Sequence, residues 1–103
     1  MIYVMAAITA NDGQREELIE AFRAILPAVR AKAGCLEYGL SIHLESGLEG
    51  QAPYDENVVT IVEKWVDLDA LKAHINDHQY QDWFEQVWPL MADASMQILT
   101  AID

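Results

Sequence analysis

The sequence is poor in basic residues and in cysteine, and it contains no long apolar run. Its 103 residues include 6 Lys and Arg against 17 Asp and Glu, which gives a formal charge of −11. This balance argues against nucleic acid as a partner, because nucleic-acid binding depends on cations that neutralise phosphates. It also argues against an anionic membrane surface. The single cysteine, Cys35, excludes an internal disulfide and a thiolate metal cluster.

Targeting and cofactor signatures are missing as well. The N-terminal segment has no basic region typical of a signal peptide, and no apolar stretch is long enough to span a bilayer. We therefore expect a cytoplasmic protein. There is no glycine-rich phosphate loop and no Gly-x-Ser-x-Gly element, so no cofactor is predicted.

Apolar residues are the abundant class, at 52% of the chain. The length suits one domain over residues 1–103. A chain this short leaves much of its surface exposed, so the extra apolar surface indicates a subunit interface.

Hydrophobic spacing divides the chain into four strands and three helical pieces. Alternating or β-branched runs predict the strands, and apolar residues at helical spacing predict the helices. Pro27 lies inside the first helix, where a kink is expected. The segment Glu45–Asn57 is rich in turn residues and predicts a long loop. The predicted elements are strand Ile2–Thr9, helix Gln14–Ala33, strand Cys35–Leu44, strand Val58–Val66, short helix Asp67–Asn76, a helical piece from about His78 to Met91, and strand Met96–Ile102.

This order is βαββαβ, the ferredoxin-like split βαβ arrangement of the α+β class. Right-handed crossovers place both helical layers on one face of a four-stranded antiparallel sheet. The strands nevertheless carry apolar residues on both faces, which is unusual for a sheet covered on one side only. We therefore expect a homodimer in which two sheets pack face to face.

The third strand and the short helix after it hold the strongest site candidates. Glu63 and Trp65 share one face of the strand, and His74 lies three residues beyond Leu71 on the helix. Trp65 and His74 are thus expected between sheet and helices, where an indole beside an imidazole suits a flat aromatic ligand. The alternative is that Trp65 is only core and that His74 is a partly exposed helix residue bonded to backbone.

Two other groups have simpler explanations. His74, His78 and Asp82 would line up to bind a metal on one unbroken helix, but the capping residues at 76–77 indicate a break, so no metal site is predicted. The last helix carries an aromatic stripe. Phe84 and Trp88 are interpreted as core, whereas Trp83 is left open between core and pocket wall.

Two segments resemble the antibiotic biosynthesis monooxygenase superfamily. Residues 33–40, AGCLEYGL, are similar to its "PGCLxYxL" segment. Residues 63–80, from Glu63-Lys64-Trp65 through His74 to Tyr80, resemble its "ExWxDxxALxxHxxxxHF" segment. The resemblance runs over nearly the whole chain, and it implies a dimeric α+β barrel.

The resemblance also implies a range of activities, namely cofactor-free oxidation of quinols or polyketides by O2, haem degradation, and isomerisation of small sugars. The haem-degrading branch uses an Asn on the first strand, and residues 2–9 contain none, which weighs against haem. We therefore predict a monooxygenase that acts on a small aromatic or quinol-like substrate with O2. The alternatives are an isomerase and a non-enzymatic small-molecule-binding or stress-response dimer.

The predicted site combines both lines of reasoning. His74, Trp65 and Glu63 are the predicted catalytic residues, with His74 or Glu63 removing a phenolic proton. The predicted substrate-binding residues are Tyr38, Ile61, Leu71, His78 and Trp83.

Overall fold

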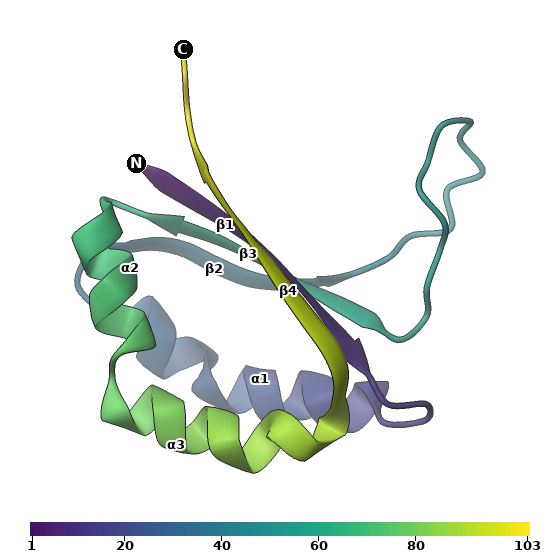
Figure 1. Ribbon diagram of the computed structural model, residues 1–103, viewed down its shortest axis with the longest axis horizontal. Helices are drawn as coiled ribbons and strands as arrows, with labels where there is room; N and C mark the ends of the chain where they lie inside the picture. The colour runs from purple at the N-terminus through teal and green to yellow at the C-terminus, as the bar shows by residue number, and fades with distance from the viewer.

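The computed structural model describes residues 1–103 as a four-stranded antiparallel sheet with all helices on one face (Figure 1). The βαββαβ order and the ferredoxin-like α+β fold are confirmed. The elements are β1 (Ile2–Ala10), α1 (Arg15–Arg30), β2 (Cys35–Ile42), β3 (Val58–Trp65), α2 (Leu68–Ile75), α3 (His78–Val87), a 3-10 turn η1 (Trp88–Leu90) and β4 (Met91–Thr100).

The sheet has the strand order β2-β3-β1-β4, so β1 and β3 are central. Residues that face each other across strands project to the same side of a sheet. Val4 pairs with Glu63, Ala6 with Ile61, and Ile8 with Val59, and all six are buried beneath the helices. The centre of the sheet therefore supplies the floor of the core.

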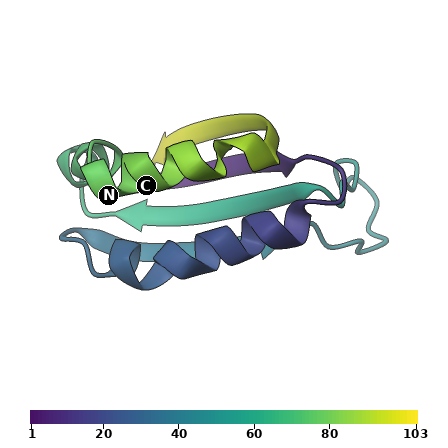
Figure 2. The ribbon, with the colours of Figure 1, turned by 90° about the horizontal axis from the view of Figure 1, so that it is seen from below.

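The two long helices lie over different parts of this sheet face. Figure 2 shows α1 along the β2 side of the sheet and α3 along the β1–β4 side. Helix α1 buries its apolar stripe and continues through Pro27 to Arg30. The N-cap residue, Gln14, makes no side-chain capping hydrogen bond. Its Oε1 accepts instead from Asn11 Nδ2, which also donates to Pro89 O.

The predicted helix break at residues 76–77 is confirmed. Asp67 caps α2 by accepting a hydrogen bond from Ala70 N, and α2 ends at Ile75. Asp77 then caps α3 by accepting from Gln79 N. The chain thus turns directly after His74, and this turn brings the side chain of Asp77 back toward α1.

Two predictions on the C-terminal part were wrong. Strand β4 begins at Met91 rather than at Met96, because residues 91–95 pair with β1 as the continuation of the same ladder. Trp88 is 54% exposed rather than core, because α3 ends at Val87 and the 3-10 turn containing Pro89 carries Trp88 outward.

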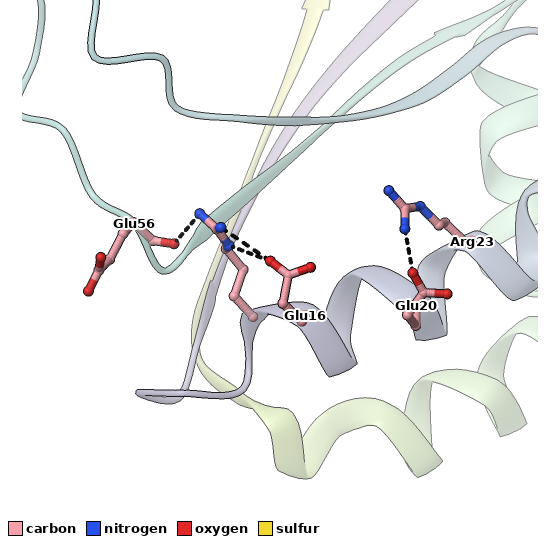
Figure 3. Close-up of polar contacts among 5 residues, drawn as sticks. Glu16, Glu20, Arg23 and Glu56 are labelled. Atoms are coloured by element: carbon pink, nitrogen blue, oxygen red, sulfur yellow. Dashed lines mark hydrogen bonds and ion pairs between the residues drawn. The ribbon is translucent and has the colours of Figure 1, made fainter.

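The segment between β2 and β3 projects from the body of the molecule (Figure 1). Arg15 at the start of α1 ties its base to the core, since its guanidinium donates to Glu56 O at 2.9 Å. Figure 3 shows this contact beside the Glu20–Arg23 ion pair on the exposed face of α1. None of the helices has both the length and the apolar character needed to cross a membrane.

Candidate active site

A cavity of about 450 Å³ lies between the sheet and the helices, within the size range of small-molecule sites. Its lining is mostly apolar and aromatic, which suits a flat hydrophobic ligand. The polar groups Glu63 and His74 converge on it from β3 and α2. The apolar and aromatic lining includes Ala6, Ile8, Phe22, Tyr38, Ile61, Leu71, Ile75, Tyr80, Phe84 and Met96.

Glu63 is a buried carboxyl group held by its neighbour on the same face of β3. The Trp65 indole nitrogen donates a hydrogen bond to Glu63 Oε1 at 2.9 Å, and both side chains are buried. Burial raises the pKa of Glu63, and the hydrogen bond from Trp65 opposes that rise only in part. Glu63 is therefore a carboxylate with enhanced affinity for a proton, the property that a general base requires near neutral pH.

His74 is 3% exposed, and its imidazole ring contacts two aromatic rings. Trp65 stacks on it at 4.9 Å between centroids, with an interplanar angle of 22°, and the centroid of Tyr80 is 4.2 Å away. Its Nδ1 atom lies 2.8 Å from Lys32 Nζ. Burial, reinforced by the nearby Lys32 charge, lowers the pKa of His74 to about 4. The ring is thus neutral at physiological pH.

Two tyrosines complete the polar part of the wall. The ring of Tyr38 on β2 lies 5.8 Å from the His74 ring at an interplanar angle of 73°, and the ring of Tyr80 on α3 lies 4.2 Å from it at 46°. Burial is the main reason that the pKa of Tyr38 is raised and that the pKa of Tyr80 is raised to about 12. Both phenols stay protonated, so they offer hydrogen bonds without charge.

The structure brings most of the predicted site residues together. Tyr38, Ile61, Glu63, Leu71 and His74 all line the cavity. Their roles remain predictions, but their placement follows from strand alternation on β2 and β3 and from helical spacing on α2.

Three predicted residues do not line the cavity. Trp65 is completely buried behind Glu63 and His74, so it supports these two side chains rather than contacting the open space. His78 is exposed at the start of α3. Trp83 packs against the Phe22 ring at 4.9 Å, and its indole nitrogen donates to Ala21 O, so it joins α3 to α1.

Several lining residues were not predicted. Phe84 was interpreted as core, and Tyr80 and Met96 were given no role in a site. Ala94 and Ser95 lie before the predicted start of the last strand. Lys32 was missed altogether, because its contact with His74 joins residues 42 positions apart and no local pattern indicates it. The structure has no group of three or more His, Cys, Asp or Glu residues arranged to hold a metal ion.

Comparisons with known proteins identify the family of the chain. The antibiotic biosynthesis monooxygenase family matches residues 1–86, and the chain belongs to this family. Members of the family are typically dimeric. The chain is 26% identical over 101 residues to the protein named probable quinol monooxygenase YgiN of Escherichia coli K12, with 96% of each chain covered.

Solved structures show the same fold. PA3566 from Pseudomonas aeruginosa matches with a TM-score of 0.81 and 26% identity over 99% of this chain and 94% of that one. SO0527 from Shewanella oneidensis matches with a TM-score of 0.81 and 29% identity over 95% of this chain and 87% of that one.

Proposed function

We propose that the chain is a cofactor-independent monooxygenase that oxidises a small quinol-like aromatic substrate with O2. The observation that carries this proposal is the aromatic-walled cavity lined by both a buried carboxyl group, Glu63, and a neutral imidazole, His74. Membership of the monooxygenase family and the distant relationship to YgiN support the same reaction class.

The proposed reaction begins with a proton transfer inside the cavity. Glu63 accepts the proton of a phenolic hydroxyl, because burial raises its pKa toward the range in which a base works at neutral pH. A hydrogen bond from His74 stabilises the phenolate oxygen that forms. The apolar walls exclude water and hold the ring in place, so the anion is generated where O2 can reach it.

The anion then supplies the electrons for the oxidation. One electron passes to O2, which gives superoxide and a substrate radical, and these combine at a ring carbon as a peroxide. Glu63 returns its proton to this peroxide, and loss of water then leaves a carbonyl group at that carbon. One oxygen atom enters the product and the other leaves as water. The substrate provides every electron, so the scheme requires no external reductant.

The test is O2 consumption and product analysis with a panel of hydroquinones, using chelator-treated protein. We expect Glu63→Gln to lower kcat by about 100-fold or more, the usual contribution of a general base, and His74→Ala to lower it as well. The matched controls are Glu37→Gln, an exposed carboxylate on β2, and His43→Ala, in the segment after β2. Both controls should retain wild-type rates.

Anaerobic incubation separates the rival functions. A product that forms equally without O2 would identify an isomerase or another non-oxidative enzyme. Binding of the hydroquinones without turnover, under air and under nitrogen, would identify a binding protein. Turnover that is unchanged in both Glu63→Gln and His74→Ala would refute the assigned roles.

The proposal includes a homodimer formed through the uncovered face of the sheet. The helices cover one face only (Figure 1), and the other exposes Met5 of β1 (44%), Val62 of β3 (38%) and Leu99 of β4 (43%). Met5 and Val62 are direct cross-strand partners, so the apolar side chains adjoin at the centre of this face. Val62→Glu should shift the mass measured by sedimentation from dimer to monomer, whereas a monomeric wild-type chain would refute the proposal.

A further inference from the structure

Two charged residues that do not line the cavity, Lys32 and Asp77, also support the His74 ring. Lys32, in the turn after α1, places Nζ 2.8 Å from His74 Nδ1 and 2.9 Å from Asp77 Oδ2. The Lys32 side chain is only 21% exposed, and its ammonium group also lies 5.3 Å from the centroid of Tyr80. Contacts with His74, Asp77 and Tyr80 therefore fix the Lys32 ammonium group against Nδ1 of the imidazole.

The hydrogen-bond geometry determines the tautomer of this imidazole. An ammonium group has only donors, so Nδ1 of the neutral ring must be the acceptor and the proton must reside on Nε2. Lys32 lines a second hollow of about 610 Å³. It does not line the cavity of about 450 Å³ between the sheet and the helices, which is called the inner cavity below. His74 lines both.

The Nε2 atom is the remaining polar group of the ring. It has no hydrogen-bond partner within the protein, and yet the structure contains no fully buried side-chain nitrogen or oxygen that lacks a partner. Nε2 is therefore accessible to a ligand or to water. Because Nδ1 faces Lys32, which does not line the inner cavity, and His74 itself does line it, Nε2 is the ring nitrogen left to bond a ligand there.

We propose that Lys32, anchored by Asp77, is a positioning residue that holds His74 as an Nε2–H donor, so that the cavity binds its ligand through an anionic or carbonyl oxygen. The ligand class rests on the proposed function, in which a phenolate forms beside His74. The tautomer does not rest on it. With Lys32 in place the imidazole donates into the cavity and cannot serve as the base, which leaves proton removal to Glu63.

Charged and titratable groups surround His74 on several elements. Their charges predict how the pKa of His74 should change when Lys32 or Asp77 is replaced. Removing Lys32 removes a nearby positive charge, so the pKa of His74 should rise from about 4 toward 6.5. Removing the Asp77 charge should lower that pKa further, because the carboxylate opposes the effect of Lys32. The surrounding groups are Lys32 before β2, Tyr38 of β2, Glu63 of β3, Asp77 before α3 and Tyr80 of α3.

The first experiment needs no substrate. Two-bond ¹H–¹⁵N correlation spectra of the full chain identify the tautomer of each histidine, and a pH series gives the midpoint for His74. We expect Nε2–H in the wild type, an upward shift of the midpoint in Lys32→Met, and a downward shift in Asp77→Asn. Lys32→Arg restores charge and donor and should behave as the wild type. The control is Lys72→Met, an exposed cation two residues before His74.

The second experiment uses 4-nitrophenol, whose phenolate absorbs at longer wavelength than the phenol. Wild type and Lys32→Arg should stabilise the bound phenolate and lower the apparent pKa of the dye, whereas Lys32→Met should lose most of this shift. The result that overturns the proposal is an Nδ1–H tautomer in the wild type, or Lys32→Met and Asp77→Asn titrations that coincide with it. If Lys32→Met fails to fold, Asp77→Asn and Lys32→Arg decide the question alone.

These outcomes are independent of turnover. A confirmed tautomer and dye shift without O2 consumption would refute the monooxygenase and keep Lys32 as a positioning residue. O2 consumption in Lys32→Met with wild-type kcat and KM would refute the positioning role and keep the monooxygenase.

Discussion

The depressed pKa of His74 predicts a specific dependence of stability on pH. In the folded chain the pKa is about 4, whereas an exposed imidazole has an ordinary value of 6.5. As the pH falls through this interval, the unfolded chain binds a proton that the folded chain does not. The free energy of unfolding must therefore decrease as the pH falls from 6.5 to 4.

The magnitude follows from the two pKa values. Each unit of difference is worth about 1.4 kcal/mol. Integrated by linkage from about pH 7 to about pH 4.5, the His74 contribution to the free energy of unfolding falls by about 2 kcal/mol. That is a large share of the stability of a domain of this size.

The perturbation that isolates this contribution is His74→Gln, because an amide can still accept from Lys32 but does not titrate. Urea unfolding, followed by tryptophan fluorescence at one protomer concentration, gives the free energy of unfolding at each pH. The 17 acidic residues titrate in both proteins and cancel in the difference. The wild-type advantage at neutral pH should shrink by about 2 kcal/mol by about pH 4.5. If the free energies of unfolding of the wild type and His74→Gln changed in parallel with pH, the conclusion that His74 is a buried, neutral imidazole would be refuted.

Two further substitutions test the support of the site. Gly34→Ala should destabilise the chain by about 3 kcal/mol in thermal or urea unfolding, since Gly34 has φ +80° and a Cβ there would lie 2.6 Å from Ala70 Cβ. Gly13→Ala, at φ +78° with open space around it, is the matched control and should cost only about 1 kcal/mol. Trp65→Phe removes the donor to Glu63, so the ¹³C-detected pKa of that carboxyl should rise and the chain should lose about 1–3 kcal/mol. An unchanged carboxyl titration would contradict the hydrogen bond.

Most of the fold could be predicted from the sequence, because each central element carries a periodic apolar pattern. Strand β3 alternates around Ile61 and Trp65, and the cap residues at 76–77 mark the helix break that the structure contains. The start of β4 could not be predicted. Residues 91–95 have little intrinsic preference for strand, and only their pairing with β1 makes them extended.

Site residues could be predicted from the sequence only where strand alternation or helical spacing determines which way the side chain faces. Alternation places Glu63 and Tyr38 on the helix side of the sheet, and helical spacing places His74 beside Leu71. Lys32 gave no such signal, because it comes from a turn that meets α2 only in the folded chain. The sequence therefore indicated an imidazole in the cavity but not its tautomer, and the tautomer decides whether His74 donates or accepts.

The overall charge of the chain bears on the same chemistry. A protein with a formal charge of −11 repels anionic ligands over the range of a Debye length, about 8–10 Å at moderate salt. A quinol that arrives as a neutral molecule is not repelled, and it becomes an anion only after Glu63 has taken its proton inside the cavity. Of the six basic residues, Lys32 is the one in contact with His74, so its positive charge acts on the anion through the imidazole that lies between them. The acidic surface and the half-buried cation behind His74 thus favour one order of events, in which binding precedes ionisation.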